Sequence, residues 1–136
     1  MCSRSDSAEI NLSLSADEVE FIRRFFEGYR HAELEHYLRR WVELIREIEE
    51  EGYKLNLDDY SNDIFVRKTV EDVIECAPET LKQKLIEWLR PWDERFRAAT
   101  FDAEKFKSPF EGEWWYRLPK KAKGELADDF RKMGIP

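Results

Sequence analysis

Apolar residues recur at three- and four-residue intervals along most of this 136-residue chain, which is the spacing of amphipathic α-helices. The first such pattern begins at Ser15, which forms a capping box with Glu18, while Leu14 and Val19 are placed as a hydrophobic staple. The buried side of this first helix is expected to consist of Val19, Ile22, Phe26 and Tyr29, with Phe21 and Phe25 beside them.

Two longer helices are predicted next in the chain. The second runs from about Ala32 to Glu50 on a wide apolar face, and residues 53–57 are expected to form an extended connection. Asp58 or Asp59 is suited to cap the third helix, which ends near Cys76.

Proline and glycine delimit the remaining helices. Pro78 suits the first turn of a fourth helix, where its missing N–H has no cost. The apolar register continues across Pro91, so Pro91 is interpreted as a kink or as the start of a fresh helix, not as a domain boundary. A last helix is predicted from about Gly124 to Met133, and Gly134 ends it.

Between residues 100 and 121 the helical periodicity fails while aromatic residues become frequent. We expect this segment to lie across the helices and to be fixed there by its rings. The predicted fold is therefore all-α. Residues 1–11 are expected to be a flexible N-terminal tail, and residues 12–136 a single domain of about five helices with an aromatic-rich irregular segment before the last one.

The composition supports a folded chain, because 42% of the residues are hydrophobic and 14% are aromatic, while the many charges of both signs are interspersed. Two cysteines, Cys2 and Cys76, do not suggest a disulfide framework. No apolar stretch reaches the roughly 18 residues of a membrane span, and the N-terminus does not have the pattern of a signal peptide. The expected location is the cytoplasm, without a membrane partner.

The net charge of −7 is concentrated in the first half of the chain. Residues 1–63 carry 16 acidic and 8 basic residues, whereas residues 64–136 carry 14 and 15. Duplex nucleic acid is excluded as a partner because binding to phosphates depends on Lys and Arg, and a basic protein surface is the expected complement. The acidic residues predicted to bind it are Glu47, Glu49, Glu50, Glu51, Asp58, Asp59 and Asp63.

The sequence offers few groups for catalysis. His31 and His36 are five positions apart, which places them about 140° apart on one helix, too far around the axis to share a metal there. His31 with Glu35 supplies only two ligands, and the run from Asp59 to Asp63 lacks the glycine of a calcium loop. No nucleophile elbow, glycine-rich phosphate loop or CxxC motif occurs, so no cofactor is expected and a binding protein is favoured over an enzyme.

The run Trp114, Trp115, Tyr116 and Arg117 is the most unusual local composition. Aromatic and basic residues of this kind stack on single-stranded bases, form hot spots of protein interfaces, or anchor a loop to the core. Adjacent residues of an extended segment point to opposite sides, so one tryptophan is expected inside and the other outside.

Three functions are compatible with these patterns. The first is a small acidic inhibitor of the immunity or antitoxin type, which covers a basic partner protein by steric and electrostatic contact. The second is a helical adapter or regulatory module, in some forms a homodimer, which uses residues 114–123. The third is a helical-bundle enzyme that binds a metal or a ligand through His31 and Glu35.

Overall fold

The computed structural model describes residues 10–108, 110 and 112–135. Its helices are α2 (Ala16–Phe25), α3 (Leu34–Glu50), α4 (Leu57–Cys76), α5 (Glu79–Ala99) and α6 (Gly124–Met133). A short antiparallel pair joins β1 (Thr100–Phe101) to β2 (Leu118–Pro119). The predicted all-α class with about five helices is confirmed, and the aromatic-rich irregular segment precedes the last helix as expected.

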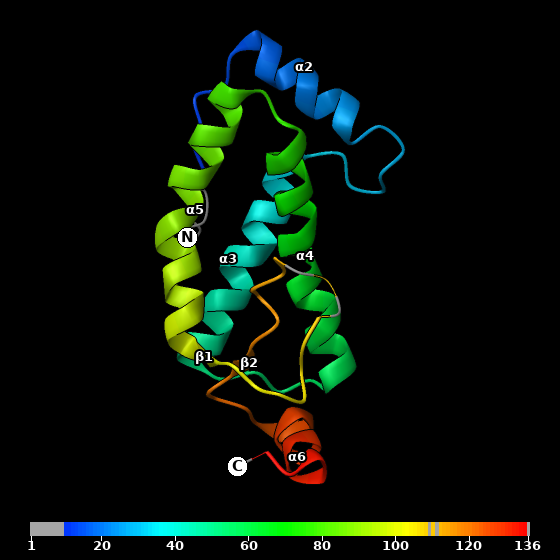
Figure 1. Ribbon diagram of the computed structural model, residues 1–136, viewed down its shortest axis with the longest axis vertical. Coiled ribbons are helices and arrows are strands. Elements are labelled where there is room, and N and C mark those ends of the chain that lie inside the picture. Colours follow the sequence, from blue (N-terminus) through cyan, green and yellow to red (C-terminus); the bar gives the residue numbers. More distant parts are fainter. Residues whose placement is uncertain (1–9, 109, 111, 136) are drawn as a thin grey trace, which may run out of the picture.

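Helices α3, α4 and α5 form the body of the molecule and run down, up and down in alternation (Figure 1). Their apolar faces meet in one core, because each helix repeats apolar residues at helical spacing. Fully buried members include Trp41 and Ile45 of α3, Tyr60 and Ile64 of α4, and Phe96 of α5. None of the described helices is long and apolar enough to cross a lipid bilayer.

Helix α2 lies across the top of this body in Figure 1. The predicted capping box is confirmed, since Ser15 Oγ accepts from the Glu18 amide at 3.2 Å and Glu18 accepts from the Ser15 amide at 2.8 Å. The predicted buried stripe is partly wrong. Val19 is 52% exposed and Tyr29, which lies beyond the helix end at Phe25, is 44% exposed. Ile22 and Phe26 are buried as predicted, and Phe21 and Phe25 are partly buried against the core.

The helix boundaries correct two details of the sequence analysis. Asn56, not Asp58 or Asp59, caps α4, since its Oδ1 accepts from the Asp59 amide at 2.8 Å. The two aspartates occupy the first turn, where negative charge favours the helix dipole. Pro91 lies inside the continuous helix α5, so no fresh helix begins there.

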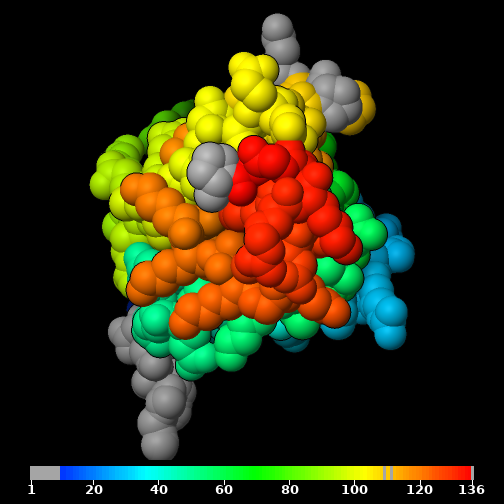
Figure 2. Space-filling view, turned by 90° about the horizontal axis from the view of Figure 1, so that it is seen from below, coloured from blue at the N-terminus to red at the C-terminus, as the bar shows by residue number. Residues whose placement is uncertain are grey.

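The lower end of the molecule joins segments far apart in sequence. The Tyr53 amide donates to Lys121 O and the Lys123 amide to Tyr53 O, both at 2.8 Å, which fixes the α3–α4 connection to the segment before α6. Seen from below, the orange side chains of that segment lie between the red α6 and the blue-green connection (Figure 2). Most of the predicted tail, residues 1–9, lies outside the described residues, but Ile10 packs against the core.

Candidate functional site

An acidic surface follows the line where α3 meets α4, and we call it the acidic seam. Its carboxylates come from Glu43, Glu47, Glu51, Asp59 and Asp63. Helical spacing places the three glutamates on one face of α3, because they are four residues apart. The two aspartates approach from the first turns of α4. The structure therefore brings together acids from both sides of the α3–α4 connection, as the sequence predicted.

Tyr53 lies at the centre of the acidic seam. Its hydroxyl donates to Asp63 Oδ2 at 2.5 Å, and the ring is fully buried. Burial raises the pKa of the Tyr53 phenol above its ordinary range, and the Asp63 hydrogen bond and the charges of Asp63, Glu47 and Asp59 add to this. The phenol therefore stays protonated and remains a donor to the seam.

The seam holds more negative charge than its own bases neutralise. Arg40 lies 3.5 Å from Glu43 and 3.8 Å from Asp63, both long for an ion pair. Loss of solvent raises the pKa of Glu47, and the neighbouring charge of Asp63 adds to the rise, against the opposing effect of Lys54 and Arg40. The ionised form of Glu47 is therefore disfavoured mainly by loss of solvent and to a smaller extent by the charges of Asp63 and Glu51.

Two of the predicted acids, Glu49 and Glu51, pair with basic residues of the chain itself. Arg95 donates to both oxygens of Glu49, at 2.9 and 2.5 Å, and Lys121 Nζ donates to the Glu49 carbonyl at 2.6 Å. Lys54 pairs with Glu51 at 3.2 Å. These bases compensate the negative end of α3, which has no basic residue in its own last turn.

Glu50 and Asp58 stay at the surface on either side of the α3–α4 connection. Both residues are exposed. They extend the acidic seam toward the end of the molecule.

The tryptophans of the aromatic segment take the two positions that the sequence predicted. Trp115 is buried, with 1% exposure, and its Nε1 has no hydrogen-bond partner within the described part of the chain. Trp114 is partly exposed and lies between two guanidinium groups, Arg67 at 5.5 Å and Arg97 at 4.1 Å from the ring centroid. Trp115 is therefore a core anchor, and Trp114 is the ring that reaches a surface.

A buried charged network holds this segment against the helices. Arg67 of α4 is 4% exposed and donates to both oxygens of Asp93 at 3.2 and 2.9 Å, and to Glu71 at 2.8 Å. Asp93 also accepts from Trp41 Nε1 at 3.0 Å. The guanidinium group lies 5.5 Å from the rings of both Trp114 and Trp115. One arginine thus connects α3, α4, α5 and the segment after β1.

Tyr116 and Arg117 also face inward. Arg117 donates to Thr100 Oγ1 at 2.9 Å and to Thr100 O at 3.1 Å, while its own carbonyl accepts from the Tyr60 hydroxyl. The Tyr116 ring packs against Phe106 at a centroid distance of 5.4 Å. Both side chains stabilise the short sheet and the irregular segment.

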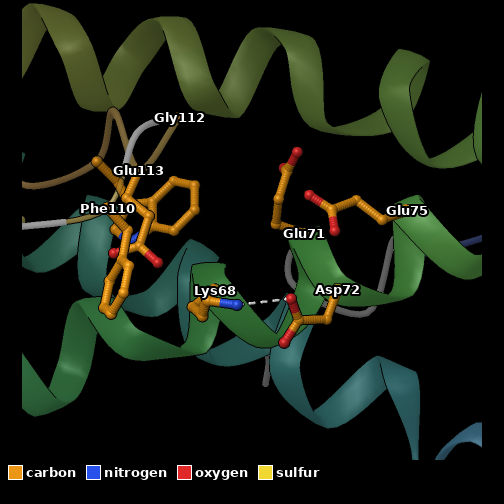
Figure 3. A pocket seen from close by; sticks show the side chains of 8 residues that line it. Lys68, Glu71, Asp72, Glu75, Phe110, Gly112 and Glu113 are labelled. Atoms are coloured by element: carbon orange, nitrogen blue, oxygen red, sulfur yellow. Dashed lines mark hydrogen bonds and ion pairs between the residues drawn. The ribbon is translucent and has the colours of Figure 1, made fainter.

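A concave site of about 320 Å³ lies beside this segment. Glu71, Asp72 and Glu75 project from α4 on one side, and Phe110 and Glu113 approach from the irregular segment on the other (Figure 3). Lys68 crosses the floor to pair with Asp72 at 2.7 Å. Acidic residues form much of the pocket lining. Phe110 also lines the pocket, and 68% of its surface is exposed.

The histidines take an arrangement that the helical-wheel argument did not foresee. His31 precedes α3, so the 140° separation does not apply, and its ring stacks on His36 at a centroid distance of 3.9 Å. Glu35 pairs with Arg39 at 2.8 Å. In the part of the chain that the structure describes, no group of three His, Cys, Asp or Glu side chains is placed to hold a metal ion.

Comparison with known proteins gives no relative from which a function could be transferred. No protein-family model matches the sequence, and neither the curated proteins nor the solved structures contain a match.

Sequence reasoning missed two residues that organise these surfaces. Glu43 belongs to the acidic seam, and its spacing of four from Glu47 was a signal that could have identified it. Arg67 carries no such signal, because a buried arginine on an amphipathic helix looks like a surface arginine until its partners Asp93 and Glu71 are in place.

Proposed function

We propose that this protein is a small cytoplasmic inhibitor of the immunity or antitoxin type, which binds a basic partner protein through the acidic seam. The observation that carries the proposal is the convergence of α3 and α4 carboxylates around Tyr53, where Arg40 and Lys54 oppose only part of their charge. The pKa of Glu47 is raised first by loss of solvent, and a cationic partner would offset the smaller part of the rise that comes from Asp63 and Glu51. The chain itself would perform no chemistry.

The geometry suits electrostatic recognition. Carboxylates on two rigid helices are positioned before the partner arrives, so little side-chain or backbone order is lost on binding. An acidic patch also accelerates the encounter with a basic protein and so favours rapid neutralisation of a toxic partner. Glu50 and Asp58 enlarge the acidic surface at its edge, where charges mainly affect the association rate.

The packing of residues 114–117 favours the acidic seam over this aromatic segment as the surface that binds a partner. Trp115, Tyr116 and Arg117 are committed to internal packing and hydrogen bonds. An adapter that used this segment as a whole would have to unpack it from Arg67 and Thr100. The acidic seam needs no such rearrangement.

The proposal is tested by affinity capture from the source cell's lysate at low salt and again at high salt. Three immobilised forms are compared: the unmodified protein, the double variant Glu47→Lys/Asp59→Lys, and the control double variant Glu27→Lys/Glu87→Lys, which makes the same charge change on exposed residues elsewhere. Circular dichroism first establishes that all three forms are folded.

We expect one basic protein to bind the unmodified and control forms, to be absent from the Glu47→Lys/Asp59→Lys form, and to be released by salt. With that protein purified, the association should be one to one, with a rate that falls steeply as ionic strength rises. Equal capture by both double variants would rule out the acidic seam. Recovery of the protein's own dimer alone would favour the homodimeric adapter.

A further inference from the structure

The segment between α2 and α3 forms a loop at the side of the molecule (Figure 1). It carries His31, while His36 lies in the first turn of α3. The two imidazole rings are nearly parallel, at an interplanar angle of 14°, and their centroids are 3.9 Å apart. The stack therefore joins the loop to the helix through the two histidines of the chain.

A second contact holds the same loop. The Tyr37 hydroxyl donates to the His31 carbonyl oxygen at 2.9 Å. The Tyr37 ring stacks on the fully buried Phe26 at a centroid distance of 5.2 Å, and it meets the His36 ring edge to face at 5.0 Å. His31 is thus held at its ring by His36 and at its backbone by Tyr37, so the stack and this hydrogen bond together position the loop.

The surroundings of the stack oppose a proton on His36. Burial lowers the pKa of His36 first, and positive charge lowers it further. The positive charge comes from His31 in the loop and from Arg40 and Arg39 of α3. Glu33, at the N-terminal cap of α3, acts in the other direction and favours the proton.

Other titratable groups at this contact are engaged elsewhere. Glu35 pairs with Arg39 at 2.8 Å, and Asp63 of α4 lies 3.8 Å from Arg40. Burial raises the pKa of Tyr37, so its phenol stays neutral throughout the range in which histidines titrate. The positive neighbours of the stack therefore act against its protonation.

We propose that the two histidines form an acid-sensitive latch, which holds the loop of residues 28–33 closed until both rings carry a proton. The first proton is tolerated, because a cation can lie over the face of an uncharged aromatic ring. Two positive charges 3.9 Å apart repel each other enough to change the ratio of closed to open loops by roughly fivefold, even in water. Because the pKa of His36 is lowered in the folded protein, the closed loop is favoured above the ordinary histidine pKa of 6.5 and loses this advantage as the pH falls below it.

Opening of the latch would release the loop and leave α2 in place. Glu18 of α2 pairs with Lys84 of α5 at 2.7 Å, and the pKa of Glu18 is lowered to about 2 by this hydrogen bond and others. Glu18 therefore stays ionised over the whole range in which histidines titrate. The latch does not depend on the function proposed for the acidic seam.

Solution NMR of the full chain tests the latch, with the pH lowered until the imidazole chemical shifts show that both rings are protonated. The nuclear Overhauser effect between the two rings measures the closed state. We expect it to fall by about fivefold or more, while the amide signals of α2 and the helical circular dichroism stay unchanged. An effect that persists with both rings protonated would overturn the proposal. Loss of helix before that point would also overturn it, because the acid would then act on the fold as a whole.

Three variants separate the latch from a general effect of acid. His31→Phe keeps an aromatic ring on His36 that cannot be charged, so the ring contact should persist throughout the titration. Glu33→Gln removes the carboxylate that favours the proton on His36, so opening should require a lower pH. Glu87→Gln, at an exposed carboxylate of α5, is the matched control and should open at the same pH as the unmodified protein. Equal loss of the contact in His31→Phe, or an equal opening pH in the two glutamine variants, would show that the stack does not sense the acid.

Discussion

At the scale of single residues, Arg67 shows how one buried charge determines the positions of side chains from several elements. Its hydrogen bonds to Asp93 and Glu71 satisfy a guanidinium group that is almost fully removed from water. Removing one partner of a buried ion pair is costly because the other charge remains in the interior. The adjacent rings of Trp114 and Trp115 also depend on this group.

Arg67→Met should therefore lower the free energy of unfolding by about 3–5 kcal/mol. Arg67→Lys should recover only part of this, because an ammonium group cannot form the two parallel bonds to Asp93. Urea unfolding measures the change, and Arg24→Met, at an exposed arginine, is the control. A loss below about 1 kcal/mol for Arg67→Met would show that the network contributes little to stability.

For Glu47 the expected change in stability has the opposite sign, because removing its charge should stabilise the folded protein. Its pKa is raised in the folded state, so the folded protein binds this proton more tightly than the unfolded chain does, and the ionised carboxylate opposes folding. Glu47→Gln should raise the melting temperature at pH 7, and the gain should disappear when the pH falls below the ordinary range of a glutamate. Thermal unfolding between pH 4 and 8 tests this. A lower melting temperature at pH 7 would show that Glu47 stabilises the fold.

The sequence predicted the roles of those residues whose interaction partners lie close to them along the chain. Ser15 and Glu18 form their capping box within four residues, and the acids of the seam are concentrated in one short stretch. The aspartates at the start of α4 were misassigned as caps because Asn56 stands directly before them and takes that role. Arg67 was missed because its partner Asp93 is 26 residues away.

At the scale of elements, α2 is joined to the body by a small set of contacts. Glu18 is buried and pairs with Lys84 of α5 at 2.7 Å, while Ile22 and Phe26 supply the apolar contact. Lys84 also donates to the Ser13 carbonyl at 2.9 Å. The attachment of α2 therefore depends strongly on one ion pair.

This ion pair predicts an acid-sensitive attachment of α2. The hydrogen bond from Lys84, with others from Thr80 and Ser15, lowers the pKa of Glu18 from 4.5 to about 2. A depressed carboxyl pKa gives stability that is present above pH 4.5 and is lost as the pH falls toward 2. Glu18→Gln should speed amide hydrogen exchange in α2 at pH 7, and Glu87→Gln should not. Equal exchange in both variants would contradict the role of the pair.

The joint between α6 and the α3–α4 connection gives a second prediction at this scale. Gly124 has a φ of +52°, and a Cβ there would lie 2.9 Å from the carbonyl oxygen of Lys54. Gly124→Ala should lower the free energy of unfolding by more than about 1 kcal/mol, because both the backbone and the contact are strained. Gly112→Ala, at φ +85° with open space around it, separates the backbone effect from the contact. Equal losses would assign the whole effect to the backbone.

The helices themselves were predictable because their apolar periodicity persists for many residues. The short sheet was not, since Thr100–Phe101 and Leu118–Pro119 contain too few residues for an alternating pattern and are fixed by Arg117 and Tyr60.

At the scale of the whole molecule, the acidic seam and the network around Arg67 share no side chain among the described residues. Sites without common partners behave additively. Glu47→Gln and Arg67→Met should therefore change the free energy of unfolding additively. Coupling between them, measured by a double-mutant cycle, would show that the two groups of side chains are linked through α4.

The hydrogen bonds at the lower end of the molecule also determine when the chain can be complete during synthesis. The helices α3, α4 and α5 meet through short connections, and such local contacts form quickly. The bonds from Lys121 to Glu49 and from Leu57 to Asp129 each span 72 positions. A nascent chain that has emerged only to the end of α5 would therefore leave the groove around Arg67 open to water and uncovered by tryptophan. We expect the last step of folding on the ribosome to await emergence of residues 112–135, so a product stalled before them would expose the groove around Arg67 to chaperones.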